Sequence, residues 1–159
     1  MAKYNQLVFK KGKEKALDAL FVGGSDETSS TPAVFGYLAL GYNPNTDANG
    51  FEDPDGESEN VAENGGFQEI VDAENYERIA LTAVPSGTPT IDAQNGQIIK
   101  KYQAELPASN TTNQYINQFA ICDTQTVGDE TTIFYSAAAF NTFLKTSDTS
   151  ITFIVGFKI

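Results

Sequence analysis

The strongest constraint on the fold is an alternation of apolar residues near the C-terminal end of the sequence. In residues 150–159 (SITFIVGFKI), every second residue from Ile151 onward is apolar. Because successive side chains of a β-strand point to opposite faces, these residues form one apolar face. So much apolar surface needs to be paired or packed, so we predict that this strand belongs to the core.

Six further segments have the composition of β-strands. The strongest are residues 34–42 (VFGYLALGY), which are apolar on both faces, and residues 77–84 (ERIALTAV). The others alternate, some imperfectly, and are residues 4–9, 97–106, 113–122 and 131–139. Many short strands separated by polar turns predict a mainly β protein. We expect an antiparallel β-sandwich, of jelly-roll or immunoglobulin-like type.

Residues 13–21 (KEKALDALF) are the one segment with a convincing helical pattern. Their apolar residues recur at helical spacing, and two glycines follow them. A polar linker over residues 25–32 separates this helix from the strands. We therefore divide the chain into an N-terminal basic arm with a short helix, residues 1–24, and a β-sandwich domain, residues 33–159.

Residues 43–66 form a long acidic segment between two predicted strands. Two prolines, four glycines and seven acidic residues make the segment too polar to build a core, so we expect a loop. Residues 45–50 resemble the start of an EF-hand calcium loop, but Gly56 stands where a bidentate Glu is needed. A solvated loop is therefore the expectation. Calcium is the alternative, with Asp47, Asp53 and Asp55 as weak candidate ligands.

The sequence lacks the groups that many catalytic mechanisms need. It has no histidine, no tryptophan and one cysteine, Cys122. These absences exclude a disulfide within the chain, a Cys/His zinc site and a catalytic His, and no phosphate-binding or nucleophile-elbow motif is present. We predict no enzyme activity, no catalytic residue and no cofactor. We also predict a buried, inert Cys122 thiol and an ion pair of the only arginine, Arg78, with Glu69 or Asp72.

The net charge of −11 is unevenly distributed. Five lysines and one glutamate give residues 1–15 a charge of +4, which leaves −15 on the remainder. An acidic body repels phosphate backbones, so nucleic acid is not an expected partner. No apolar run is long enough to span a membrane, and no signal-peptide pattern is present. The basic segment is either a solvated tail or an arm that docks on an acidic surface.

Docking would involve the basic and apolar residues of the arm. The predicted interface residues are Lys3, Tyr4, Lys10, Lys11, Lys13 and Phe21. Aromatic residues in the long loop or at strand ends are further candidates, because such side chains are enriched at interfaces. These residues are Tyr42, Phe51 and Phe67.

Several short motifs occur in a characteristic order over residues 33–159. They are YLALG at 37–41, YERIAL at 76–81 with Glu69 before it, a strand over residues 100–106, INQFAICD at 116–123, and the C-terminal strand. This order resembles that of a loosely defined set of tailed-bacteriophage virion proteins. The resemblance implies a non-enzymatic structural protein: an auxiliary capsid subunit (a decoration or cement protein) or a head-fibre subunit that binds the assembled shell.

Two alternatives stay open. The resemblance also allows a tail- or fibre-associated module, and the acidic loop at 43–66 separately suggests a carbohydrate-binding or host-surface-binding domain. The partners that the resemblance implies are other virion proteins, either the major capsid protein or tail and fibre proteins, and further copies of the chain in a homo-oligomer. Neither nucleic acid nor membrane is expected as a partner. The implied location is the virion, assembled in the cytoplasm of a bacterial host.

Overall fold

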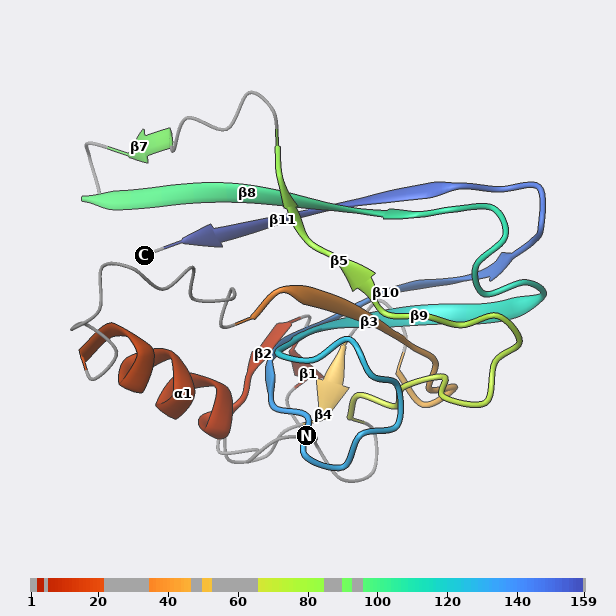
Figure 1. Cartoon of the computed structure of the whole chain (residues 1–159), viewed down its shortest axis with the longest axis horizontal. Helices are drawn as coiled ribbons and strands as arrows, with labels where there is room; N and C mark the ends of the chain where they lie inside the picture. Colours follow the sequence, from red (N-terminus) through yellow and green to blue (C-terminus); the bar gives the residue numbers. More distant parts are fainter. Residues whose placement is uncertain are drawn as a thin grey trace.

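The fold is mainly β, built from antiparallel sheets with one short helix, α1 (Lys10–Phe21) (Figure 1). The computed structural model describes residues 3–4, 6–21, 35–46, 50–52, 66–84, 90–92 and 96–158. Its strands are β1 (Lys3–Tyr4), β2 (Gln6–Val8), β3 (Tyr37–Gly41), β4 (Phe51–Glu52), β5 (Ile79–Ala80), β6 (Thr82–Ala83), β7 (Thr90–Asp92), β8 (Gln97–Leu106), β9 (Gln114–Cys122), β10 (Phe134–Lys145) and β11 (Ile151–Lys158). The prediction of a mainly β protein with a short N-terminal helix is confirmed.

Five strands form the larger sheet, in the order β2-β10-β9-β3-β5. The central strand β9 pairs with β10 on one side and with β3 on the other. At one edge, β2 adds to β10, with Val8 opposite Ser136. The N-terminal segment is therefore part of this sheet.

The smaller sheet is centred on β8. Strand β11 pairs with one edge of β8 in continuous register, from Ile151 opposite Leu106 to Lys158 opposite Ile99. Strands β6 and β7 pair with β8 as well. The chain passes from the larger sheet to the smaller between β5 and β6, where the Leu81 N–H donates to the Gly36 carbonyl at 2.8 Å.

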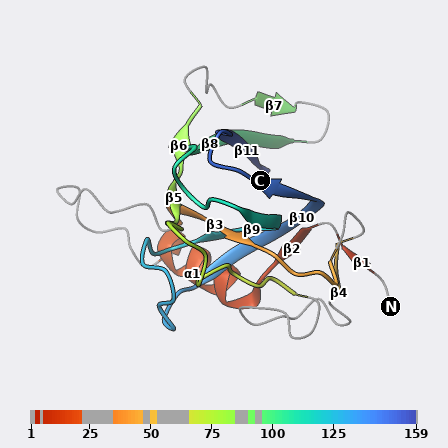
Figure 2. The same ribbon diagram turned by 90° about the vertical axis from the view of Figure 1, so that its right-hand side faces the viewer.

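The two sheets face each other across an apolar core, with the smaller sheet above the larger in Figure 2. Aromatic rings join them: the ring centroids of Phe119 and Phe153 are 5.8 Å apart, and those of Tyr135 and Phe157 are 6.0 Å apart. The fully buried residues between the sheets include Leu38, Leu40, Ala104, Leu106, Ile116 and Ile121. Burial of these apolar side chains is the main driving force for the packing of the two sheets.

A second core covers the opposite face of the larger sheet, the side on which α1 lies in both ribbon views. Phe9, Phe51 and Phe67 pack there against the small side chains of the sheet, and each is at most 2% exposed. The prediction that Phe51 and Phe67 are interface residues is therefore wrong. Their neighbours in sequence are polar, so the tertiary packing that buries them is invisible in the local pattern.

Helix α1 approaches β10 closely because of Gly12. A Cβ atom at this position would lie 2.5 Å from Tyr135 Cα and 2.6 Å from the Phe134 carbonyl oxygen. Any side chain at residue 12 would push the helix away from the sheet. Glycine therefore stands inside a helix despite its low helix propensity.

Most predicted elements are present, and their bounds differ where tertiary structure intervenes. The helix begins at Lys10, three residues earlier than predicted. The predicted strand at 77–84 is split into β5 and β6, because the chain changes sheets there. Strand β10 continues to Lys145, past a register shift that interrupts its alternation. The acidic segment contains β4, which pairs with β1.

Candidate functional site

The lysines of α1 divide into two groups. The side chains of Lys10, Lys11 and Lys13 are exposed. Lys15 instead fastens the helix to the sheet: its Nζ is 2.6 Å from Asp123 Oδ2 and 5.9 Å from the centroid of the Phe35 ring. Helix α1 therefore presents three cationic side chains from a position fixed on the larger sheet.

The other predicted interface residues are Lys3, Tyr4 and Phe21. Lys3 and Tyr4 form β1, whose backbone pairs with Glu52 and Phe51 in a separate two-stranded sheet. Phe21 is the last residue of α1. The side chains of Lys3, Tyr4 and Phe21 lie outside the described part of the structure.

The three weak calcium candidates, Asp47, Asp53 and Asp55, also lie outside the described residues. Within the described ranges, no group of three or more carboxylate, thiol or imidazole side chains is placed to hold a metal ion. In the same ranges, no helix is long and apolar enough to cross a membrane.

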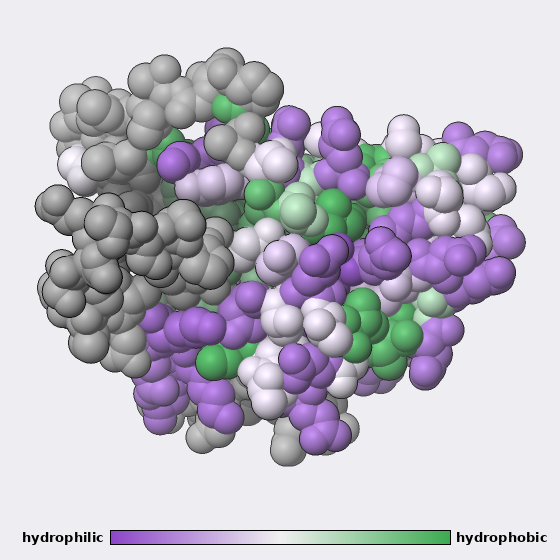
Figure 3. Space-filling view, viewed as in Figure 1, coloured by the Kyte–Doolittle hydropathy of each residue, from purple (hydrophilic) through white to green (hydrophobic). Residues whose placement is uncertain are grey.

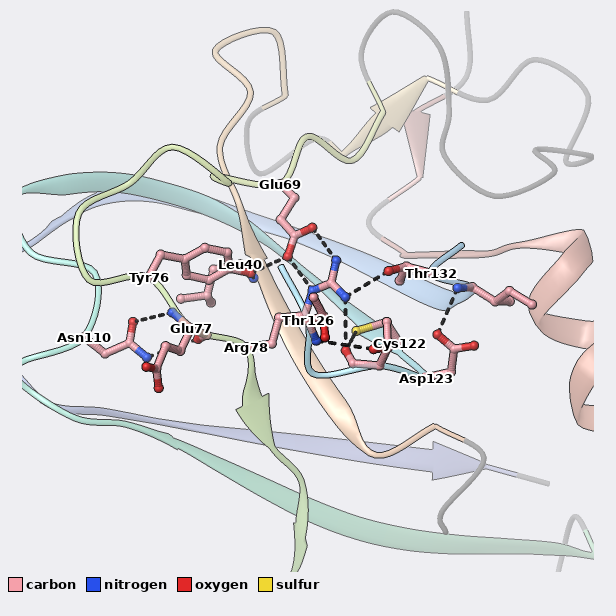
Figure 4. Close-up of polar contacts among 12 residues, drawn as sticks. Leu40, Glu69, Tyr76, Glu77, Arg78, Asn110, Cys122, Asp123, Thr126 and Thr132 are labelled. Carbon is pink, nitrogen blue, oxygen red and sulfur yellow. Dashed lines mark hydrogen bonds and ion pairs between the residues drawn. The ribbon is translucent and has the colours of Figure 1, made fainter. Parts of the chain in front are cut away.

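The most elaborate polar cluster is centred on Arg78 (Figure 4). Its Nε and Nη2 atoms donate to the two carboxylate oxygens of Glu69, each at 2.7 Å. Its Nη1 donates to the Thr124 carbonyl and to Thr132 Oγ1, both at 3.0 Å. The predicted ion pair of Arg78 is thus confirmed, with Glu69 rather than Asp72 as the partner. This two-pronged geometry is the strong form of an arginine–carboxylate contact.

Tyr76 completes the cluster. Its hydroxyl donates to Glu69 Oε1 at 2.7 Å and accepts the Leu40 N–H at 3.0 Å. Burial and the neighbouring Glu69 carboxylate raise the pKa of Tyr76 far above its ordinary value, because both disfavour a phenolate. Tyr76 is therefore a neutral donor at any physiological pH.

Cys122 lies beside this cluster at the end of β9. The residue is fully buried, and burial raises the pKa of its thiol to about 12. Since the thiolate is the reactive form, this thiol is inert in the folded protein, as predicted. Together, Arg78, Glu69 and Tyr76 tie the segment before β5 to β3 and to the β9–β10 connection, which is a structural role.

A second buried polar cluster is formed by the side-chain amides of Asn117 and Gln118 on β9. In the sequence, Asn117 only interrupts the apolar face of the predicted strand at 113–122. Asn117 Nδ2 donates to the carbonyls of Asn43 and Thr46, at 2.8 and 2.7 Å. The neighbouring Gln118 Nε2 donates to Thr46 Oγ1 and to the Gly66 carbonyl, at 2.7 and 3.0 Å. The two ends of the acidic segment, at residues 43–46 and 66, are thus both held by side chains of β9. The available signal was the Asn-Gln pair inside an otherwise apolar strand.

Lys145 is a further buried polar residue that sequence reasoning missed. It is 0% exposed, and its Nζ donates to the carbonyls of Ala108 and Thr146 at 3.0 and 2.8 Å. Burial lowers the pKa of this ammonium group. Lys145 therefore joins the β8–β9 and β10–β11 connections.

On the face of the molecule seen in Figure 3, the described residues are mostly hydrophilic, with separate apolar patches. Large apolar side chains that remain exposed are Val8, Leu17, Val71, Tyr115, Leu144 and Ile154. Tyr115 and Leu144 are cross-strand partners on β9 and β10, and some exposed apolar side chains are normal for a protein surface.

Comparisons with known proteins identify no relatives. No protein-family model, no curated protein and no solved structure matches this chain.

Proposed function

We propose that this protein is a non-enzymatic structural subunit of a tailed-phage particle. Its place is on the assembled shell, as an auxiliary capsid subunit (a decoration or cement protein) or a head-fibre subunit. Its two facing sheets are the layers of an antiparallel β-sandwich of jelly-roll or immunoglobulin-like type. The motif order over residues 33–159 supports this proposal.

The observation that carries the proposal is the exposed cationic face of α1 on a strongly acidic chain. Lys10, Lys11 and Lys13 are exposed, while Phe9 is fully buried and Lys15 is paired with Asp123. A helix held in place in this way loses little conformational freedom on binding, so more of the binding energy is retained. Its charge directs it to an acidic patch on the shell and speeds association.

The function then follows from mass action. A subunit that binds only the assembled lattice stabilises that lattice by its free energy of binding, multiplied over many copies. This role needs no catalytic group. The chain has no histidine, and its most chemically capable side chains, Arg78, Glu69 and Tyr76, are hydrogen-bonded to one another.

The proposal is tested by neutralising the α1 lysines. The triple variant Lys10→Gln, Lys11→Gln, Lys13→Gln should bind purified phage particles at least tenfold more weakly in a co-sedimentation assay at low salt. That loss corresponds to about 0.5 kcal/mol for each of three surface charges. Binding of the unaltered protein should also weaken as salt is raised.

A matched control separates the location of the charges from the net charge. The triple variant Ser109→Glu, Ser147→Glu, Ser150→Glu changes the net charge by the same amount at exposed positions in the β8–β9 and β10–β11 connections, at the other end of the sheets from α1 (Figure 1). It should bind particles almost as well as the unaltered protein. Equal weakening by both variants would show that α1 is not the docking surface.

A carbohydrate-binding or host-surface-binding domain is the second candidate function. One observation favours it: buried amides of β9 hold both ends of the acidic segment at residues 43–46 and 66. Binding of the protein to host cells without binding to particles would support this candidate over the first.

A further inference from the structure

The outer edge of β11 is a strand edge without the usual protection. Strand β11 pairs with β8, and no other described strand pairs with it. Natural edge strands carry charges, prolines or bulges that prevent further pairing. From Ile151 to Phe157, β11 has no charged residue and no proline, and its register with β8 is uninterrupted. Its backbone is therefore a template for one more strand.

A groove runs beside this edge. It has a volume of about 210 Å³ and lies between Val155–Phe157 on β11 and the strands β2 and β10. Residues Val155–Phe157 of β11 form one wall of the groove, to which Gly156 contributes only backbone atoms. The opposite wall is formed by Gln6, Val8 and residues 135–138. Val8 is 40% exposed, so an apolar side chain is left half-covered in the groove.

The groove exists because the larger sheet extends beyond the smaller. Rings on β11 pack over β9 and β10, as the contacts of Phe153 with Phe119 and Phe140 show. Strand β2 lies one strand further out than β10. One additional strand beside β11 would lie above β2 and would cover Val8.

Two copies of this chain cannot fill the space by pairing their β11 strands. Antiparallel pairing through a two-fold axis places both larger sheets on the same side of the joined smaller sheets. Each β2 strand would then overlap the β10 strand of the other copy below the junction. A single extended segment beside β11 avoids this overlap.

The surrounding charge indicates the chemistry of that segment. Lys100 is exposed and stands opposite Phe157 on the neighbouring strand, on the same face of β8 as Tyr102, whose ring centroid lies 5.3 Å from Lys100 Nζ. Lys10 follows Val8 by two residues and is also exposed. This end of the groove is cationic although the chain as a whole carries a charge of −11. It favours carboxylates at one end of the bound segment.

We propose that the β11 edge binds an extended segment of a partner protein, with apolar residues at every second position and carboxylates at one end. The segment adds a strand to the smaller sheet through its backbone, and its apolar side chains cover Val8. Main-chain pairing of this kind supplies affinity, and the side-chain pockets supply specificity. The inference does not depend on the proposed function.

The probe is a fluorescein-labelled synthetic peptide, Asp-Glu-Val-Thr-Val-Thr-Val-Ser, tested against the full chain by fluorescence anisotropy. We expect saturable binding with a Kd of roughly 10–100 µM. Hydrogen exchange should show new protection of backbone amides between Ile151 and Phe157. A peptide with proline in place of its central valine should not bind, because it cannot complete the backbone ladder.

Protein variants locate the binding site. Val8→Gln should weaken peptide binding about fivefold or more, whereas Leu17→Gln, a matched change of an exposed apolar residue on α1, should leave it unchanged. Lys100→Glu should weaken binding, whereas Lys101→Glu, the same change at an exposed position on the opposite face of β8, should not. No saturable binding, equal effects of the paired variants, or protection confined to other strands would overturn the proposal. Particle binding through α1 is a separate measurement, so the two proposals can fail independently.

Discussion

Replacing Arg78 by methionine should destabilise the protein severely, because it removes hydrogen bonds from several buried groups at once. The side chains of Arg78 and Glu69 are 1% and 10% exposed. Methionine fills much of the volume but donates no hydrogen bond. Glu69 would keep its bond from Tyr76, while the Thr124 carbonyl and Thr132 Oγ1 would each lose the Arg78 bond.

The expected loss of unfolding free energy is about 3–5 kcal/mol, the range for removing one partner of a buried ion pair. Stabilities of single domains are about 5–15 kcal/mol, so the variant would be near its folding limit. With a urea dependence of about 2 kcal/mol/M, the unfolding midpoint should fall by roughly 2 M. Circular dichroism during a urea titration measures this shift.

Two further variants show whether the loss comes from the ion pair. Glu69→Gln should also destabilise, and the double variant should lose less than the sum of the single losses, because the two side chains act together. Lys13→Met, at an exposed position on α1, should change stability by less than about 0.5 kcal/mol. A loss below about 1 kcal/mol for Arg78→Met, or additive losses in the double variant, would refute this account of the cluster.

Three other outcomes follow from the structure. Gly12→Ala should lower the melting temperature, although alanine is ordinarily favoured in a helix by about 1 kcal/mol, because its Cβ would meet the Tyr135 backbone at 2.5 Å; a higher melting temperature would contradict the close packing. Cys122 should not react with a thiol reagent until the protein unfolds, and stability should fall as the pH rises from about 9 to about 12, because the unfolded thiol ionises there while the buried one does not; a Cys122→Ala variant with an equally steep decline would contradict this. Calcium and a chelator should leave the melting temperature unchanged, since the acidic segment at 43–66 lacks the Glu of an EF-hand; a rise with calcium would support a metal site there.

The sequence predicts best the strands whose alternation of apolar residues and flanking turns lie within the segment itself. Strand β8 has the predicted bounds, and β9 and β11 agree with them to within one residue at each described end, because alternation and flanking turns mark such strands clearly. Helix α1 begins three residues before the predicted start, and its first turn contains Gly12, a residue of low helix propensity. Only the nearby β10 backbone explains why a glycine is needed there.

Features that depend on distant contacts were harder to predict. Nothing local in residues 77–84 indicates that the chain changes sheets at Leu81. The Arg78–Glu69 pair could be predicted, because a lone arginine near a strand start needs a nearby carboxylate. The roles of Asn117 and Lys145 could not, because their partners lie in other loops.

We propose that this protein is a structural component of a phage particle, and the most direct test of this proposal is its copy number in virions. Quantitative mass spectrometry of purified particles measures this number against the major capsid protein. The account predicts many copies per particle, in a fixed ratio to the shell subunits. Absence of the protein from purified particles would contradict it.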